Sequence, residues 1–555
     1  MLLSRVEIEN FRGIRQLDLW LDQTTALIGE NNAGKSSLLD ALMIALGGEG
    51  ETVTFESRDF HRHEPGAPPA SRLRVALTFQ ETAPREWSRH ALSPLAAAMT
   101  GRGARELRLD IGARRDGRGG IVRGHWSFGG AASRRGGHGP SGWLALLRRA
   151  SPLLRLRSNR YFEEDPRAAL RLRTAAPSAD PVVQQAEHQA RLVYDRLTGR
   201  YEVDLAELRA GLEAAREYLD RHGGRIAGNG VRRRIIEELA DTPVRPGRSE
   251  AEPLDAMKEG AGVRALALLA LVGALLEASA RGAMAVDAEP IVAIEDAEAH
   301  LHPTALSALW SLIDALPAQK IATTNSGELL ASVPLTSIRR LVRTPDRVRV
   351  HRIDAAALTL EDRRRIAYHV RINRAGAMFA RAWLLVEGET EAWLLPELAR
   401  LRGVEFPAEG VRCIEFAQCG VRPLVRLATD LGIGWHLLAD GDESGRSYAA
   451  VARAMLAGEN EREHITELEA DDLEHYLWDN GYAAVYRNTA GPLGFRRREK
   501  PGVVIDRAIR VRSKPGLALE IVEAANAPGS PGVPPSLAAA IDAVVRLART
   551  SAGTA

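Results

Sequence analysis

The sequence TALIGENNAGKSSLLDAL, residues 25–42, places an apolar run, a glycine-rich turn and an amphipathic segment in direct succession. The turn, Gly29–Ser37, satisfies the pattern G-x-x-x-x-G-K-[ST]. Glycines in this pattern let backbone N–H groups close around phosphates, while its lysine reaches the outer phosphates and its hydroxyl ligates Mg²⁺. The order strand, turn, helix therefore predicts an α/β domain that binds ATP with Mg²⁺. The predicted ligands are Gly29, Asn32, Gly34, Lys35, Ser36 and Ser37.

Composition limits the classes of protein to which the chain can belong. Its 555 residues exceed what one hydrophobic core ordinarily holds, so at least two domains are expected. A hydrophobic fraction of 45% and a charged fraction of 26% are typical of a globular protein. No apolar run is long enough for a membrane span and the N-terminus does not resemble a signal peptide, so we expect a cytoplasmic protein. Cys413 and Cys419 provide neither a disulfide framework nor a zinc site.

An acidic motif, IVAIEDAEAHLHP at residues 291–303, complements the phosphate loop. Its apolar start predicts a strand, with Glu295 and Asp296 at the carboxyl end. We expect Glu295 to hold the Mg²⁺ shell and Asp296 to orient or polarise the attacking water. A solvated acidic turn is the alternative, but it explains neither the apolar strand nor the pairing with a phosphate loop far upstream.

Two further apolar segments each end in a pair of carboxylates. In WLLVEGETEAWLLPELA, Glu387 ends the first segment and Glu391 falls on the first turn of the next helix. In HLLADGDESGRS, Asp440 and Asp442 are two residues apart and thus share a face where the second strand ends. Converging carboxylates need cations, and oxygen ligands select Mg²⁺ or Mn²⁺. Two such ions can stabilise the attacking and leaving oxygens of phosphodiester hydrolysis.

These motifs together resemble those of a known family. VEIENFRGI and GENNAGKSSLLDAL are similar to the head of RecF/SMC-type ATPases, and EDAEAHLHP resembles the second acidic motif of the OLD (overcoming lysogenization defect) family. E-G-x-x-E followed by D-x-D resembles the Toprim fold that OLD nucleases use. The resemblance implies an ABC-type ATPase joined to a Toprim endonuclease or nickase that cuts DNA as a homodimer. It also implies roles in phage defence or DNA repair, and leaves room for a separate helicase partner.

The resemblance implies further residues at the nucleotide site. EGAGVRALALLAL occupies the place of the loop by which a second subunit closes over the nucleotide. Gly260 and Gly262 fit this loop, but its usual serine is missing. Asn325 stands where the family has a switch histidine. Both departures favour slow hydrolysis, or ATP binding used as a switch.

The resemblance also implies residues that complete the nuclease site. DDLEHYLW resembles the family's later acidic helix, which makes Asp472 and Glu474 candidate ligands of a second metal. Glu469 is a rival, and a solvated helix start is the alternative reading. Lys514 matches the family's Lys-Pro segment and would neutralise the transition-state phosphate, with Lys500 as the alternative. The chain contains only five lysines, so one retained here suggests a need for a compact ammonium.

The expected fold class is α/β, with a RecF/SMC-like ABC ATPase domain, a helical dimerisation insertion, a Toprim domain and a helical C-terminal part. The Gly- and Arg-rich residues 100–142 predict a solvated insertion or, alternatively, a DNA-touching loop. A non-cutting RecF/SMC-like DNA-repair clamp is the alternative function, whereas a topoisomerase, primase or transporter role is disfavoured. The predicted boundaries are 1–150 and 246–375 for the two ATPase parts, 151–245 for the insertion, and 376–555 for the Toprim domain with its tail.

Overall fold

The structure is a computed structural model that describes residues 1–157 and 289–551. Gly260, Gly262 and nearly all of the predicted insertion at 151–245 lie outside the described residues, so the predictions about them stay predictions. Within the two ranges, the residues left out are 48–49, 65, 83–85, 87–91, 101–104, 116–119, 130–141, 297, 299–305, 307–309, 311–312, 315–317, 355, 357, 369–374 and 492–498.

The described residues divide into two compact units. The first contains Met1–Leu341 and Asp346–Val350, and the second contains Val342–Pro345 and His351–Ala555. The four predicted domain boundaries stay predictions, because the segment between the two ATPase parts is largely outside the described residues. None of the described helices combines the length and the hydrophobicity needed to cross a membrane.

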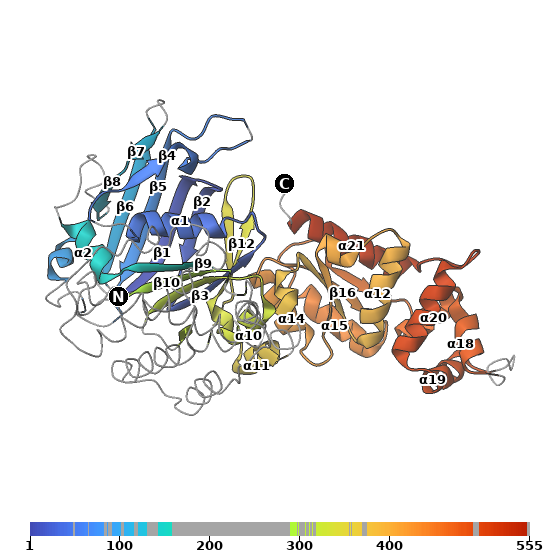
Figure 1. The fold of residues 1–555 in the computed structure, drawn as a ribbon. Helices are drawn as coiled ribbons and strands as arrows, with labels where there is room; N and C mark the ends of the chain where they lie inside the picture. Colours follow the sequence, from blue (N-terminus) through green and yellow to red (C-terminus); the bar gives the residue numbers. More distant parts are fainter. Residues whose placement is uncertain are drawn as a thin grey trace, which may run out of the picture. The chain divides into compact units, whose positions relative to one another are not determined.

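An eleven-stranded mixed sheet forms the first unit, in the order β8-β6-β5-β1-β2-β13-β12-β3-β11-β10-β9. Strands β1, β2, β5, β6 and β8 pair antiparallel, whereas β12, β3, β11, β10 and β9 pair parallel. Helix α1 lies across this sheet (Figure 1). The strands are β1 Leu2–Phe11, β2 Ile14–Trp20, β3 Thr24–Gly29, β4 Thr54–Glu56, β5 Arg72–Gln80, β6 Glu106–Arg114, β7 Ile121–Arg123, β8 His125–Phe128, β9 Leu153–Arg157, β10 Ile291–Glu295, β11 Gln319–Thr323, β12 Ile338–Arg343 and β13 Val348–Arg352. The helices are α1 Lys35–Leu46, α2 Trp143–Ala150 and α10 Gly327–Ser332, with 3-10 turns at Ser57–Asp59, Ser93–Ala98 and Leu335–Ser337.

Hydrophobic alternation explains why this unit folds as it does. In β1, Val6 and Ile8 are fully buried while the residues between and after them are partly exposed, so one face of the strand packs on the core. Leu38 and Leu42, one helical turn apart on α1, join the same core cluster. The prediction of a solvated insertion or loop at residues 100–142 is wrong for part of that range, because β6 and β8 belong to the main sheet and Leu107, Leu109 and Ile111 are buried in its core.

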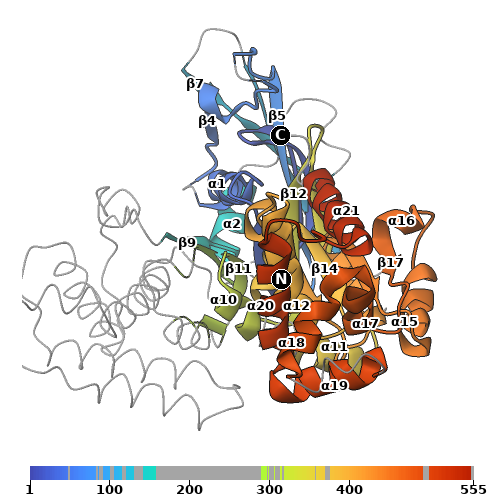
Figure 2. The ribbon, with the colours of Figure 1, turned by 90° about the vertical axis from the view of Figure 1, so that its right-hand side faces the viewer.

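A four-stranded parallel sheet forms the second unit, in the order β15-β14-β16-β17. All five residues of β14 are buried, as expected for a parallel sheet covered on both faces. Helices α12 and α20 pack against each other, and they lie side by side in Figure 2. The strands are β14 Ala382–Val386, β15 Val411–Glu415, β16 Gly434–Ala439 and β17 Ile465–Glu467. The helices are α11 Leu360–Ile366, α12 Glu389–Leu401, α13 Phe406–Glu409, α14 Val421–Asp430, α15 Glu443–Arg453, α16 Glu461–His464, α17 Leu473–Leu477, α18 Ala483–Thr489, α19 Pro501–Val511, α20 Lys514–Asn526 and α21 Pro535–Ser551, with a 3-10 turn at Ala375–Phe379 and a π turn at Trp478–Tyr482.

Candidate active sites

The phosphate loop connects the end of β3 to the start of α1, as the motif predicted. Gly29 and Gly34 both have positive φ, of 143° and 96°. A Cβ atom on Gly29 would lie 2.4 Å from the carbonyl oxygen of Leu341, so the loop requires glycine there. The Lys35 side chain is buried, and its ammonium donates to the carbonyl oxygens of Gly29 and, at 3.1 Å, Glu30. The loop is thus closed around the ammonium that the motif assigns to phosphate binding.

The acidic motif lies close enough to the phosphate loop for its carboxylates to interact with Lys35. Asp296 follows β10 with a positive φ of 49°, an uncommon conformation for a residue other than glycine. Its backbone N–H donates to Thr323 Oγ1 at 3.0 Å, at the end of β11. Burial, with the negative charges of Glu298 and Glu295, raises the pKa of Asp296. Burial lowers the pKa of Lys35 against the opposing attraction of Asp296 and Glu298.

Glu298 is a residue of this site that the sequence analysis missed. Its carboxylate accepts a 2.7 Å hydrogen bond from Thr324 Oγ1 and another from the backbone N–H of Asn325. Glu298 thereby ties the acidic motif to the predicted switch position. The signal was present in the sequence, because Glu298 is the third acid of the run EDAE.

Glu295, at the end of β10, forms an ion pair that the sequence did not predict. Its Oε2 atom lies 2.6 Å from Arg155 Nη2 on β9, the strand that pairs with β10. Ser36, which the motif assigns to Mg²⁺, is exposed at the start of α1. A Cβ atom on Gly13 would lie 3.4 Å from Ser37 Oγ, so the turn between β1 and β2 also borders the phosphate loop.

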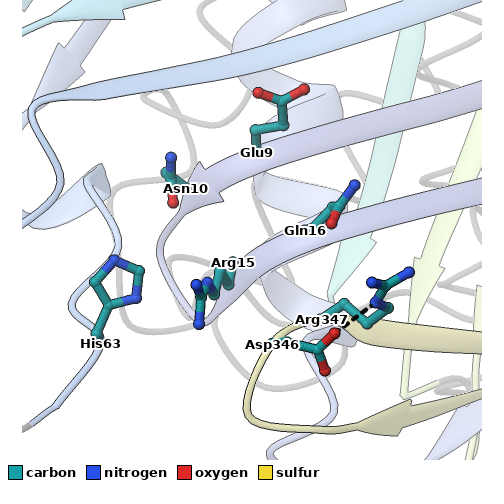
Figure 3. A pocket seen from close by; sticks show the side chains of 7 residues that line it. All are labelled: Glu9, Asn10, Arg15, Gln16, His63, Asp346 and Arg347. Atoms are coloured by element: carbon teal, nitrogen blue, oxygen red, sulfur yellow. Dashed lines mark hydrogen bonds and ion pairs between the residues drawn. The ribbon is translucent and has the colours of Figure 1, made fainter.

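A separate hollow of about 580 Å³ lies at the β1–β2 turn. Figure 3 shows side chains from both strands around it, together with the ion pair between Asp346 and Arg347 at 2.8 Å. None of its lining residues was predicted to bind nucleotide. They are Glu9, Asn10, Arg15, Gln16, His63, Asp346 and Arg347.

In the second unit, the paired carboxylates occupy the predicted places. Glu387 directly follows β14, and Glu391 lies on the first turn of α12, where it is buried. Asp440 directly follows β16. Asp442 caps α15, with Oδ1 accepting a 2.6 Å hydrogen bond from the Gly445 N–H. Since β14 and β16 are neighbouring parallel strands, both pairs of acids lie at the same edge of the sheet.

Two glycines allow the turn that carries Asp440 and Asp442. A Cβ atom on Gly441 would lie 2.5 Å from the carbonyl oxygens of Leu468 and Ala470. A Cβ atom on Gly445 would lie 2.0 Å from the carbonyl oxygen of Asp440. No side chain fits at either distance, so this turn requires glycine at both ends of the sequence GDESG.

The carboxylates at this edge perturb one another. Burial, followed by the negative charges of Glu391 and Glu387, raises the pKa of Asp440 to about 8. Burial also raises the pKa of Glu387 and of Glu391. Asp442 contributes to the shift of Glu387, and Glu474 contributes to that of Glu391. The structure therefore brings the acids predicted from distant motifs into one electrostatic cluster.

Two observations bear on whether a divalent ion fits this cluster. Glu387 Oε2 is buried without a hydrogen-bond partner, which is unusual for a carboxylate oxygen. Oxygen-rich, charge-dense sites of this kind suit Mg²⁺ or Mn²⁺. In the described part of the chain, no three His, Cys, Asp or Glu side chains are already arranged to hold an ion. The chemistry of these oxygen donors suits a hard cation, but their present arrangement in the described residues does not form an ion site.

The candidates for the second metal differ in their existing contacts. Glu474 is buried, and its Oε1 atom lies 2.9 Å from Lys514 Nζ. Asp472 caps α17 and accepts 2.7 Å contacts from the backbone N–H and the ring Nδ1 of His475. Glu469 accepts hydrogen bonds from Ser536 Oγ at 2.9 and 3.0 Å. All three carboxylates are thus already engaged, and Glu474 is the one of them that is buried.

The structure distinguishes between the two candidate lysines by their contacts. Lys514 is the first residue of α20 and contacts the carboxylate cluster through Glu474. Lys500 instead precedes α19 as its N-cap residue. The geometry brings Lys514, rather than Lys500, to the predicted nuclease site.

Comparisons with known proteins agree with these motifs. Residues 1–377 match the family model described as "Protein of unknown function (DUF2813)", and residues 378–442 match the overcoming lysogenization defect protein-like Toprim domain. The chain belongs to the DUF2813 family and is an OLD protein. It is 38% identical over 574 residues to the uncharacterized protein YbjD of Escherichia coli K12, with 99% of each chain covered. The predicted OLD resemblance is therefore confirmed.

Solved structures with related parts include an OLD protein and an SMC head. The C-terminal region of the Burkholderia pseudomallei OLD protein is 16% identical, covering 31% of this OLD chain and 99% of its own, with a TM-score of 0.25. The SMC head domain from Thermotoga maritima is 12% identical, covering 64% of this chain and 100% of its own, with a TM-score of 0.31. The fold class is confirmed by the strand orders, the phosphate loop and the Toprim match: an ATPase-type unit is joined to a Toprim nuclease-type unit.

Proposed function

We propose that this OLD protein is an ATP-binding, divalent-metal-dependent DNA endonuclease or nickase. The observation that carries the proposal is the cluster of carboxylates with raised pKa values around the unpartnered Glu387 Oε2, with Lys514 beside it. Burying several carboxylates so close together costs free energy of folding unless the cluster binds a cation.

In the proposed nuclease site, each group has a distinct task. Mg²⁺ or Mn²⁺ bound there would supply positive charge to the attacking and leaving oxygens of the phosphodiester. Lys514 would neutralise the phosphate oxygens as the bond breaks, because its ammonium already lies at the edge of the cluster. The proposed ligands are Glu387, Glu391, Asp440 and Asp442 for the first ion, and Glu474 with Asp472 for the second.

In the proposed ATPase site, Lys35 would bind the outer phosphates and Ser36 would provide a hydroxyl ligand for Mg²⁺. Glu295 would order the shell of that ion and Asp296 would orient the attacking water. The loop with Gly260 and Gly262 would close the site from a second copy of the chain. ATP binding would thus be coupled to dimerisation, and through it to DNA cutting.

The test is conversion of supercoiled plasmid DNA to nicked and linear forms. The full chain is assayed with Mg²⁺ or Mn²⁺, with and without ATP, beside Lys35→Ala. Metal-dependent cutting that ATP changes in the natural chain, but not in the Lys35 variant, is the expected result. DNA binding without cutting under every condition would overturn the proposal in favour of a non-cutting clamp.

A further inference from the structure

An uninterrupted chain of ion pairs leads away from the acidic motif of the ATPase unit. Arg155 lies between two acids: Nη2 is 2.6 Å from Glu295 Oε2, and Nη1 contacts Asp40. Asp40 in turn contacts Arg12, whose Nε lies 2.8 Å from Asp59 Oδ1. Negative and positive groups alternate strictly along this chain, which we call the relay.

The relay connects parts of the nucleotide site that are distant in sequence. Glu295 ends β10, Arg155 is on β9, and Asp40 is on α1, the helix that begins with Lys35. Arg12 occupies the turn between β1 and β2, with a positive φ of 45°. Its carbonyl oxygen contacts His61 Nδ1 at 2.6 Å, which helps to fix that turn.

The charges around Arg155 are screened only weakly by solvent, whereas the Arg12 side chain is 31% exposed. The Arg155 side chain is 6% exposed, and those of Glu295 and Asp40 are 14% and 15% exposed. Charge interactions are stronger in such surroundings than at the open surface. Arg155 pairs with both Glu295 and Asp40, so Glu295 holds only part of the Arg155 charge.

We propose that Arg155 and Asp40 are positioning residues that set how strongly Glu295 attracts the Mg²⁺ of bound nucleotide. This rests on the proposed ATP site. Arg155 orients the Glu295 carboxylate and offsets part of its charge. Asp40 opposes this by drawing Arg155 toward α1. The charge available at Glu295 therefore depends on a balance that extends through Arg12 to the β1–β2 turn.

The alternation predicts opposite effects for two single substitutions. In Arg155→Met, Glu295 loses the positive charge of Arg155, so less Mg²⁺ should be needed for half-maximal ATP binding. In Asp40→Asn, Arg155 is released to Glu295, so more Mg²⁺ should be needed. We expect each shift to be about three- to tenfold, which corresponds to roughly 0.7–1.4 kcal/mol.

The experiment measures equilibrium binding of ATP by calorimetry while the Mg²⁺ concentration is varied, using the full chain. Arg339→Met is the matched control, because Arg339 is an equally buried strand arginine whose partners are Asp22 and the carbonyl oxygens of Trp20, Thr336 and Ile338. Melting temperatures identify general destabilisation. Shifts of opposite sign, with the control unchanged, would support the relay.

Other outcomes separate failure of the relay from failure of the proposed function. The Mg²⁺ concentration for half-maximal ATP binding could move in the same direction in both variants, or in neither, while the natural chain binds ATP with Mg²⁺. Either result would overturn the proposed role of the relay and leave the proposed ATP site intact. If the natural chain shows no Mg²⁺-dependent ATP binding, the proposed ATP site fails and the relay fails with it.

Discussion

The Lys514 ammonium lies 2.9 Å from Glu474 Oε1, and this contact connects α20 of the helical tail to α17, the helix that carries Glu474. Lys514 begins α20, with Ser513 as the capping residue. Helix α20 packs against α12, which carries Glu391. The tail is therefore part of the proposed nuclease site, and its packing determines where the cation stands.

Replacing Lys514 should impair cutting far more than replacing Lys500. In Lys514→Met the phosphate loses its neutralising cation, and we expect an initial cutting rate lower by about 100-fold, the usual effect of removing one charge-stabilising group. Lys500→Met is the control and should cut at the natural rate. The measurement is the initial rate of plasmid nicking with saturating Mn²⁺. Equal rates for the two variants would remove Lys514 from the site.

Replacing Gly445 should disrupt the turn that holds the acids. In Gly445→Ala, the new methyl group would lie 2.0 Å from the Asp440 carbonyl oxygen, so α15 and the turn must separate. We expect a loss of about 1–3 kcal/mol in the free energy of unfolding, as for other overpacked sites, and loss of cutting. Gly376→Ala is the control, because no atom lies within 4 Å of its added Cβ. Denaturant unfolding of both variants checks this, and similar stabilities would contradict it.

The sequence predicted the local order of the sites better than their long-range contacts. Glu387, Glu391, Asp440 and Asp442 could be placed because each follows an apolar strand, and parallel strands end at one sheet edge. The ion pair between Glu295 and Arg155 could not be predicted from the sequence, because it depends on which strand lies next to β10. In the same way, the sequence could not show that Asp472 caps its helix and pairs with His475. Such contacts depend on the packing of elements far apart in the chain.

The pKa of about 8 for Asp440 predicts how the metal-free protein responds to pH. An unfolded aspartate loses its proton near pH 4, whereas the folded one keeps it until about pH 8. Between these values the folded state binds more protons, so stability falls as pH rises. A divalent ion that replaces the proton should reduce this fall.

Melting temperatures between about pH 5 and pH 8, with chelator or with Mn²⁺, test this response. With chelator, the natural chain should lose stability across the range, and Asp440→Asn should lose less. If the two proteins show parallel curves, Asp440 is not the group responsible.

Arg148 should stabilise the phosphate-loop helix from its far end. The buried guanidinium donates to the carbonyl oxygens of Ala45 and Ile44 in the last turn of α1, at 3.0 and 3.1 Å, and to that of Gly50 at 3.0 Å. Arg148→Met leaves these carbonyls unpaired, and we expect a loss of about 2–4 kcal/mol in the free energy of unfolding. Arg149, the next residue on α2, is exposed, so Arg149→Met is the control. A loss no larger than that of the control would refute the capping role.

The most direct test of the account is metal-dependent plasmid cutting by Glu387→Gln. This change keeps the shape of the side chain while removing the charge whose buried oxygen lacks a partner. Glu397→Gln, on the outward side of α12, is the matched control. The account predicts that the natural chain and the control cut supercoiled DNA with Mg²⁺ or Mn²⁺, whereas Glu387→Gln remains folded and does not cut. Cutting by Glu387→Gln at the natural rate would show that the Toprim carboxylates are not the catalyst.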